Sequence, residues 1–346
     1  MPTDVVSSTR VPSWNGALEN QNQRQIAASL DEPFPSPTSR MGRLRDSSDS
    51  YAVRILLCEV ANTVLDEGLR ECLAEILPQS EIDQIYRFRF DADRRMALAS
   101  RVLARHVIAD EGGSDTDMLA IDIERSKKAG NRPIWKPSSP KDRFIHFNVS
   151  HDKDVVVLAA SRQLVGIDVM RIATTKEDRP LRDFFDSLRG SFSALEWRYI
   201  TQPAGERDQL ERFMELWTMK EAYVKAIATG LYVEPLRLEC VSECNGASTS
   251  STSTPPQASF ALGPMKVDGK PLASFCFRHL RQPDGYMICL AMGPHKAAHE
   301  LYGSFIPNDV LTCPYDPPAA LTDEQVWVEA VDLTDLINRY TIPGAF

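Results

Sequence analysis

Strand-like and amphipathic segments alternate along the chain from residue 53 to residue 292. Between Asp91 and Asp110, apolar residues recur every three or four positions beside several arginines, which predicts an amphipathic helix. A second long helix is predicted at residues 209–228. Runs rich in Val, Ile and Leu predict strands at residues 53–60, 119–124, 144–149, 155–160, 164–169, 236–241, 273–279 and 286–292. Each half of this region therefore offers a long helix and several strands.

This layout predicts an α+β fold of two similar α/β subdomains facing one another, at residues 51–163 and 164–293. Residues 1–50 hold nine Ser and five Pro without an apolar period, which is typical of a disordered tail. The Ser/Thr-rich residues 245–257 predict a flexible loop between strands. Residues 294–346 form a Pro-rich extension, in which residues 326–333 could dock as a strand or a short helix.

Composition and charge narrow the class of protein. The 346 residues are 43% hydrophobic and 25% charged, as in ordinary globular proteins. The net charge of −9 disfavours nonspecific binding of nucleic acid or anionic membrane. No apolar run approaches the roughly 18 residues of a membrane span, and the N-terminus lacks a secretory signal pattern. With seven scattered Cys, we expect a cytoplasmic protein with reduced thiols.

Three short motifs offer chemistry: Phe147-Asn-Val-Ser-His151, Gly166-Ile-Asp168 and Trp217-x-x-Lys220-Glu221. Asp168 and Glu221 supply carboxylate oxygens, a plausible partial shell for Mg²⁺. Structural roles are open for both side chains. Asp168 could satisfy backbone donors at a strand end, and Glu221 with Lys225 could be a surface pair of about 0.3–0.5 kcal/mol.

Phosphate contacts are predicted next to these carboxylates. The Lys225 ammonium lies one helical turn beyond Glu221 and could contact a phosphate group. Ser150 and His151 follow a predicted strand and add a hydroxyl and an imidazole that can donate to another phosphate. The alternative for His151 is a neutral surface or capping residue.

Together, in this order and spacing, the three motifs resemble those of 4′-phosphopantetheinyl transferases of the surfactin-synthetase-activating type, especially the broad-range eukaryotic members. The resemblance covers about residues 85 to 292. It implies an enzyme that moves the phosphopantetheine arm of coenzyme A onto a serine of an apo acyl or peptidyl carrier protein. It also implies Mg²⁺ as cofactor, release of adenosine 3′,5′-bisphosphate, and a pseudo-twofold, pseudo-dimeric monomer.

The resemblance gives roles to individual residues. Asp168 and Glu221 are the expected metal ligands and, with Lys225, catalytic residues. Coenzyme A contacts are expected from Ser150, His151, Lys220 and Lys225.

Basic residues upstream add further expected contacts. In Gly130-Asn-Arg-Pro133, Arg132 stands where the family has a lysine and could bind a phosphate bidentately, or the element is a plain turn. Arg87, Arg89 and Arg105 lie in or near the segment that the family uses toward coenzyme A, and Arg89 is taken as the contact.

Two positions leave alternatives. The segment Phe192 to Trp197 resembles a family element that makes Glu196 a candidate catalytic base, yet Ser193 and Glu196 equally predict a helix capping box. Many family members carry an acid where this chain has Met170, a poor Mg²⁺ ligand. Asp152 or water could fill that ligand position.

Two rival functions remain open at this stage. One is a binding module that holds coenzyme A or a carrier protein without turnover. The other is a Mg²⁺-dependent phosphodiester hydrolase that cleaves coenzyme A without a carrier. The carrier class is also open between fatty-acid, polyketide, peptide-synthetase and aminoadipate-reductase carriers.

Overall fold

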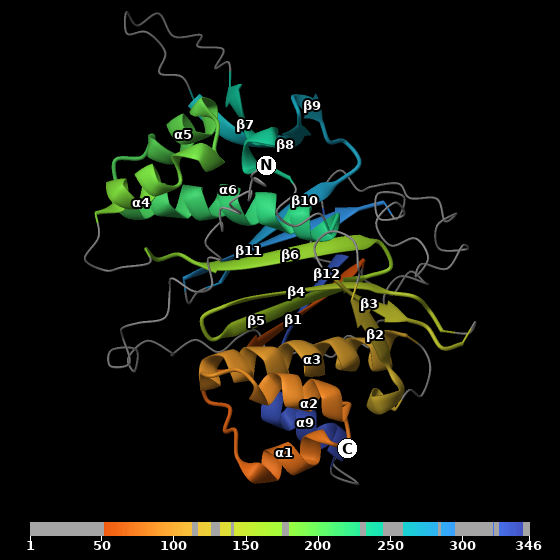
Figure 1. The fold of residues 1–346 in the computed structure, drawn as a ribbon. Coiled ribbons are helices and arrows are strands. Elements are labelled where there is room, and N and C mark those ends of the chain that lie inside the picture. Colours follow the sequence, from red (N-terminus) through yellow and green to blue (C-terminus); the bar gives the residue numbers. More distant parts are fainter. Residues whose placement is uncertain are drawn as a thin grey trace, which may run out of the picture.

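A computed structural model describes residues 52–112, 117–125, 132–139, 142–174, 180–228, 233–244, 259–282, 285–294, 321 and 325–341. The predicted tail at 1–50, the predicted loop at 245–257 and most of the extension before residue 325 lie outside this range. Within it the protein is a mixture of helices and several sheets (Figure 1).

The first sheet has the strand order β12-β1-β5-β4. Its central strands are β1 (Val53–Glu59) and β5 (Val155–Ser161), which pair antiparallel. Strand β4 (His146–Asp152) pairs antiparallel with β5, and β12 (Val326–Ala330) pairs parallel with β1. Helix α3 (Asp91–Glu111) packs on β5. Around it lie α1 (Glu67–Leu73), α2 (Gln79–Tyr86) and α9 (Leu333–Thr341).

The second sheet has the order β10-β11-β6, built from β10 (Cys276–Gln282), β11 (Tyr286–Gly293) and β6 (Leu164–Arg171). Helix α6 (Glu206–Ala226) packs across β6 and β11. Beside α6 lie α5 (Ala194–Thr201), α4 (Leu181–Ser187) and a small sheet, whose strands are β7 (Leu238–Cys244), β8 (Ser259–Val267) and β9 (Lys270–Pro271). A short hairpin of β2 (Asp122–Arg125) and β3 (Pro133–Lys136) follows α3.

The two larger sheets pack face to face. One hydrophobic cluster joins Ile55 and Val157 of the first sheet to Ile167, Val169 and Ile288 of the second. The long helices cover the outer faces, so Figure 1 shows four layers in the order α3, first sheet, second sheet, α6. Because strand side chains alternate, every second residue of β6 faces this inner core and the others face α6.

Both long helices and most strands agree with the predicted ranges. One strand expectation was wrong in part, because residues 118–120 form a 3₁₀ turn and the strand begins only at Asp122. The extension forms both a strand and a helix, β12 and α9, where one or the other was expected. In the described residues no helix is both long and apolar enough to cross a membrane.

Candidate functional site

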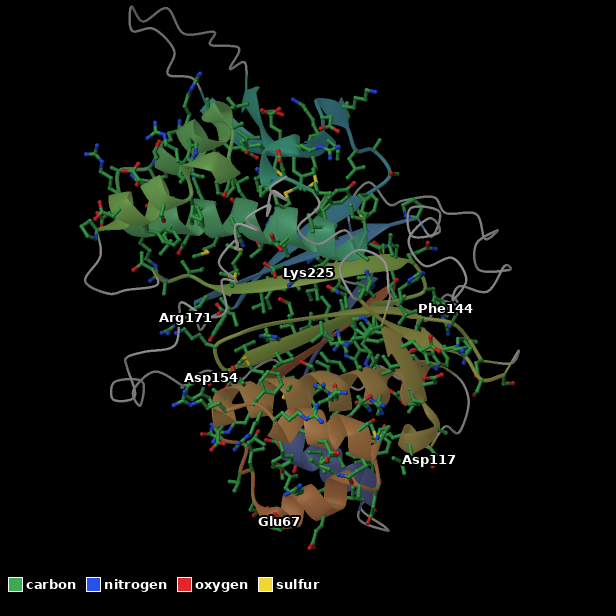
Figure 2. The ribbon with its side chains drawn as sticks, in the orientation of Figure 1. Glu67, Asp117, Phe144, Asp154, Arg171 and Lys225 are labelled. Carbon is green, nitrogen blue, oxygen red and sulfur yellow. The ribbon has the colours of Figure 1, made fainter. Side chains whose placement is uncertain are left out.

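The site forms where β4, β6 and α6 meet. Gly166 lets β6 lie directly on α6, since a Cβ there would be 2.1 Å from the carbonyl oxygen of Ala222 and 2.4 Å from the nitrogen of Ala226. Any side chain at this position would collide with the helix backbone. Two residues further along the strand, Asp168 points toward the same helix, where Lys225 occupies the last turn. Figure 2 shows Lys225 near the level at which the two sheets meet.

Asp168 is a buried carboxylate with one oxygen held and one oxygen unpartnered. Its Oδ1 accepts from Lys225 Nζ at 2.6 Å and from Ser150 Oγ at 2.9 Å, and Lys225 also donates to Ser150 Oγ at 2.7 Å. Its Oδ2 is buried and has no hydrogen-bond partner. A buried polar oxygen without a partner is costly unless a ligand completes it. A hard cation such as Mg²⁺ fits this oxygen donor.

Glu221 shares this environment. Burial raises the pKa of its carboxyl group to about 7, the negative charge of Asp168 adds to the shift, and Lys225 opposes it. The charges of Asp168 and Glu221 therefore act on one another. In the part of the chain that is described, no group of three or more His, Cys, Asp and Glu side chains is arranged to hold a metal. A cation here would have two carboxylates and would need oxygen atoms from water or substrate as well.

Asp152 occupies the end of β4, and one of its oxygens is already engaged. Its Oδ2 accepts from the backbone nitrogen of Arg171 at 2.7 Å. Burial raises the pKa of the Asp152 carboxyl group, against the lowering effect of this hydrogen bond. A role as a third metal ligand in place of Met170 stays a prediction.

Ser150 and His151 differ in their surroundings. The Ser150 hydroxyl is buried and donates to Asp168, so in this structure it holds the carboxylate in place. The His151 side chain reaches the surface but is partly surrounded by protein groups. Loss of hydration lowers the pKa of His151, the Lys225 charge lowers it further, and Asp93 and Asp168 oppose both effects. His151 therefore presents a neutral imidazole at neutral pH, close to the start of α3.

Arg132, a predicted phosphate contact, is engaged by the protein backbone in this structure. Its four terminal N–H groups donate to four backbone carbonyls, those of Lys225, Ala226, Phe147 and Val165, at 2.7–2.8 Å. These carbonyls belong to α6 and β6 and to Phe147 of β4, the three elements that form the site. The guanidinium is buried and joins them, because its planar fork presents donors in fixed directions.

The expectation of a capping box at Ser193 is confirmed. Ser193 Oγ accepts from the Glu196 nitrogen, and Glu196 Oε2 accepts from the Ser193 nitrogen. Glu196 is fully buried and also accepts from Lys220 Nζ at 2.7 Å and from the Cys240 nitrogen at 3.0 Å.

Lys220 has no N–H left for coenzyme A. Besides its bond to Glu196, it donates to the carbonyls of Ser191 and Pro235, which uses all three of its protons. Its ammonium also lies 4.5 Å from the centroid of the Phe192 ring. This geometry favours structural roles for Glu196 and Lys220 over the base and the coenzyme A contact that the sequence suggested.

The three arginines in or near α3 differ in burial and in their contacts. Arg105 is buried and bonds bidentately to Glu81, which makes it a structural residue. Arg87 and Arg89 are exposed between α2 and α3, and the Arg89 guanidinium lies 5.3 Å from the centroid of the Phe90 ring. Arg89 remains a predicted contact for coenzyme A.

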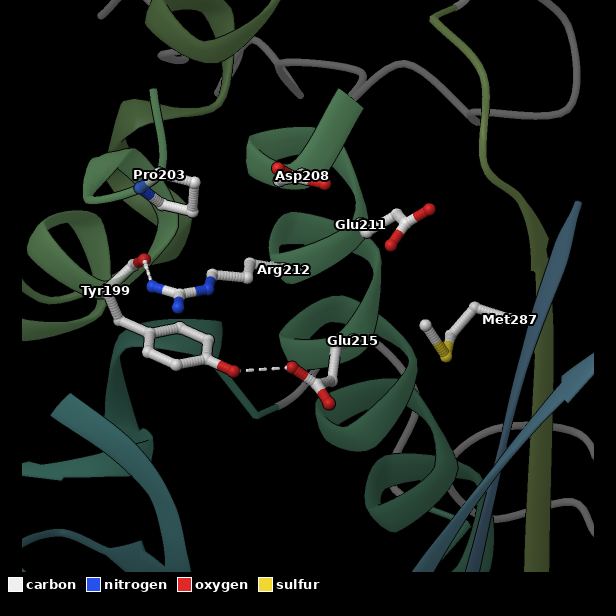
Figure 3. A pocket seen from close by; sticks show the side chains of 7 residues that line it. All are labelled: Tyr199, Pro203, Asp208, Glu211, Arg212, Glu215 and Met287. Atoms are coloured by element: carbon white, nitrogen blue, oxygen red, sulfur yellow. Dashed lines mark hydrogen bonds between the residues drawn. The ribbon is translucent and has the colours of Figure 1, made fainter. Parts of the chain in front are cut away.

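A cavity of about 370 Å³ lies between α5, α6 and β11 (Figure 3). Acidic side chains of α6 line it, and the Tyr199 hydroxyl donates to Glu215 there at 2.6 Å. It contains none of the residues predicted for the site. Its acidic lining does not suit a pyrophosphate.

Sequence reasoning gave no role to Asn148, although it lies within a recognised motif. Asn148 is buried, and its Oδ1 accepts from the Ile167 nitrogen at 2.8 Å. The available signal was the alternation of Asn148, Ser150 and Asp152, which puts three polar side chains on one face of a predicted strand.

The fold and the site define a mixed α/β protein with several sheets that holds two carboxylates and a lysine where β4, β6 and α6 meet. Comparison with known families agrees with this class. Residues 67–163 match the family described as 4′-phosphopantetheinyl transferase, N-terminal, and residues 164–276 match the 4′-phosphopantetheinyl transferase superfamily. The chain belongs to the 4′-phosphopantetheinyl transferase superfamily, as its motifs predicted.

Individual relatives extend this result. A phosphopantetheinyl transferase of Thraustochytrium sp. is 30% identical over 253 residues, which cover 71% of this chain and 80% of the relative. The human L-aminoadipate-semialdehyde dehydrogenase-phosphopantetheinyl transferase is 34% identical over 160 residues, 46% of this chain and 50% of that protein. A 4′-phosphopantetheinyl transferase of Bacillus pumilus is 34% identical over 169 residues, 48% of this chain and 65% of the relative. The chain thus matches about half the length of the human relative.

Proposed function

We propose that this protein transfers the 4′-phosphopantetheine arm of coenzyme A to a serine of an apo carrier protein and releases adenosine 3′,5′-bisphosphate. The observation that carries the proposal is the state of Asp168. Its Oδ1 is fixed by Ser150 and Lys225, while its buried Oδ2 has no partner. Membership of the superfamily supports the same reaction.

In this reaction the serine oxygen forms a bond to the β-phosphorus of coenzyme A, and the bond from that phosphorus to the bridging oxygen breaks. The pyrophosphate is strongly negative, so the main task of the protein is to position it and to neutralise its charge. Lys225 is suited to this task because its ammonium is part-exposed at the site. Lys225 donates two of its three N–H groups to Asp168 and Ser150, so the third can bind a phosphate oxygen.

Asp168 and Glu221 are the residues that would hold Mg²⁺, in agreement with the unpartnered Oδ2 and the elevated pKa of Glu221. When bound, the ion would supply positive charge against the pyrophosphate. Neither Glu196 nor Lys220 is needed in this scheme, since both are engaged in the buried pair with each other. The attacking serine would pass its proton to water at the site, since Glu221 is assigned to the ion.

His151 and Arg89 are proposed as contacts to the rest of coenzyme A, because both side chains are exposed and can donate. We further propose a pseudo-twofold arrangement of the two units in a cytoplasmic monomer. Its partners would be coenzyme A and carrier proteins, without nucleic acid or membrane. The negative net charge disfavours binding to nucleic acid and to anionic membranes.

The test is to incubate the protein with Mg²⁺, coenzyme A and an apo carrier protein and to measure intact masses. A phosphopantetheine mass gain on the carrier is expected. Coenzyme A binding without any mass gain would favour the binding module, and cleavage of coenzyme A without a carrier would favour the hydrolase.

The same assay tests the site residues. Asp168→Ala and Glu221→Ala are each expected to remove nearly all transfer while circular dichroism shows an unchanged fold. Asp154→Ala, in the exposed turn after β4, is a suitable control. Full transfer by either site variant would refute the assignment of the carboxylates.

A further inference from the structure

Strands β4 and β6 lie against each other although they belong to different sheets. The other edge of β6 is paired with β11 by backbone hydrogen bonds. On the β4 side, backbone donors of β6 bond to side chains instead. The pairs are Ile167 N to Asn148 Oδ1 at 2.8 Å, Val169 N to Ser150 Oγ at 3.3 Å, and Arg171 N to Asp152 Oδ2 at 2.7 Å. We call these three pairs the seam.

The seam has a regular spacing. Each donor on β6 lies 19 residues after its acceptor on β4, and both strands advance by two residues from one pair to the next. The two strands therefore run in the same direction with a fixed register. Figure 2 shows Asp154 and Arg171 on the same side of the molecule, where both strands end.

The register of the seam decides where Asp168 points. Strand side chains alternate between faces, so a slip of one residue would turn Asp168 toward the apolar core between the sheets. The middle pair of the seam is also tied to the site, because Ser150 Oγ accepts from Val169 N and donates to Asp168 Oδ1. Asn148 and Asp152 flank this pair on both sides, and each accepts from the backbone of β6.

We propose that Asn148 and Asp152 are positioning residues that hold β6 in register, so that Asp168 meets Lys225 and Ser150. This inference rests on the proposed transfer reaction. It gives Asp152 a role through the backbone of Arg171, in place of a role as metal ligand. The oxygen acceptor is what matters at both positions, so an amide should serve as well as the carboxylate at the part-buried Asp152, whereas a carboxylate at the buried Asn148 keeps the acceptor but adds a buried charge.

The experiment compares an acceptor-free and an acceptor-keeping variant at each position. Asp152→Ala and Asn148→Ala remove the acceptor, whereas Asp152→Asn and Asn148→Asp keep one. Asp154→Ala is the matched control in the exposed turn. Three readouts are measured: carrier modification by intact mass, Mn²⁺ binding to the coenzyme A complex by electron paramagnetic resonance, and backbone hydrogen exchange of residues 164–171.

For the alanine variants we expect a loss of kcat/KM of about tenfold to a hundredfold, because small displacements of a catalytic group have effects of this size. We also expect Mn²⁺ affinity to fall about tenfold, as for other residues that orient a metal ligand. Hydrogen exchange of residues 164–171 should become faster. Asp152→Asn should retain most of the transfer, the Mn²⁺ binding and the slow exchange, and Asn148→Asp should lose less of each than Asn148→Ala.

Two outcomes would overturn the proposal. If Asp152→Asn loses transfer and Mn²⁺ binding as fully as Asp152→Ala while exchange stays slow, Asp152 is a metal ligand. If the alanine variants match the wild type in all three readouts, the seam has no positioning role. Should an alanine variant fail to fold, Asp152→Asn decides alone: near wild-type values support the proposal and a loss refutes it. Should the wild type itself not modify the carrier, the proposed function fails, while hydrogen exchange still tests the seam.

Discussion

The buried pair of Glu196 and Lys220 allows a quantitative test of whether Glu196 is a catalytic base. Their charged atoms are 2.7 Å apart and both side chains are buried. In Glu196→Gln the Lys220 ammonium loses its counter-charge. Breaking a buried pair on one side costs about 3–5 kcal/mol of unfolding free energy. Since 1 kcal/mol corresponds to about 2–4 °C in medium-sized domains, we expect Tm to fall by about 10 °C.

A double variant separates this structural cost from chemistry. Glu196→Gln with Lys220→Met removes both charges and fills nearly the same volume. Replacement of a buried pair by apolar groups is often neutral, and the methionine sulfur can pack against Phe192, which now faces the ammonium at 4.5 Å. The double variant should therefore regain part of the lost Tm, while the carbonyls of Ser191 and Pro235, which lose their Lys220 donor, retain some of the cost.

The assay is carrier modification by intact mass, at a temperature below the Tm of every variant. If Glu196 is only structural, the double variant should regain transfer together with stability. Glu206→Gln, exposed at the start of α6, controls for loss of a carboxylate. A double variant that is as stable as the wild type but transfers about a hundredfold more slowly would refute our reasoning and restore Glu196 as the base.

Three further predictions concern stability. Because the pKa of Glu221 is about 7 in the folded protein and about 4.5 when unperturbed, the folded state keeps a proton that the unfolded chain releases. The unfolding free energy of the metal-free protein should thus fall as pH rises from about 4.5 to 7. This decrease should be about 2 kcal/mol smaller in Glu221→Gln, measured by denaturant titrations in the presence of a chelator. Gly166→Ala should destabilise the protein by several kcal/mol, about the cost of severe overpacking, or prevent folding, since the added Cβ meets the backbone of α6; an unchanged Tm would contradict the close packing. Leu336→Ala in α9 should cost about 2–5 kcal/mol in the same titrations, whereas Asp335→Ala on the exposed side should cost little; equal effects would mean that α9 is not part of the core.

Much of the fold was predictable because apolar periodicity is local. The helix α3 and the strands β5 and β6 are predicted at nearly the right residues, since apolar side chains mark each of these elements locally. The partner of β12 was not predictable. Its pairing with β1 joins residues more than 250 positions apart, and a single sequence contains no signal for such a register.

The site was predictable in its residue types and less so in their roles. Asp168 and Lys225 were singled out and do meet. The sequence predicts a phosphate contact for Arg132 because a guanidinium binds phosphate well. Backbone carbonyls are equally good acceptors for a guanidinium, and four of them bind Arg132 in the structure. Whether Arg132 binds phosphate or these carbonyls depends on how α6, β4 and β6 come together in space, and the spacing of motifs along the sequence does not reveal this. The capping box of Ser193 and Glu196 is a local pattern, so the sequence does predict it, as the alternative to a catalytic role for Glu196.

The pairing of β12 with β1 has a consequence for synthesis on the ribosome. The second sheet and its helix α6 come from one continuous stretch, so they can assemble as soon as that stretch has emerged. The first sheet cannot, since β1 is among the earliest strands made and its parallel neighbour is the latest in the described chain. Until residues 326–330 appear, β1 keeps one unpaired edge, and such edges favour association with other chains. A nascent chain stalled before that point is therefore the form most in need of a chaperone.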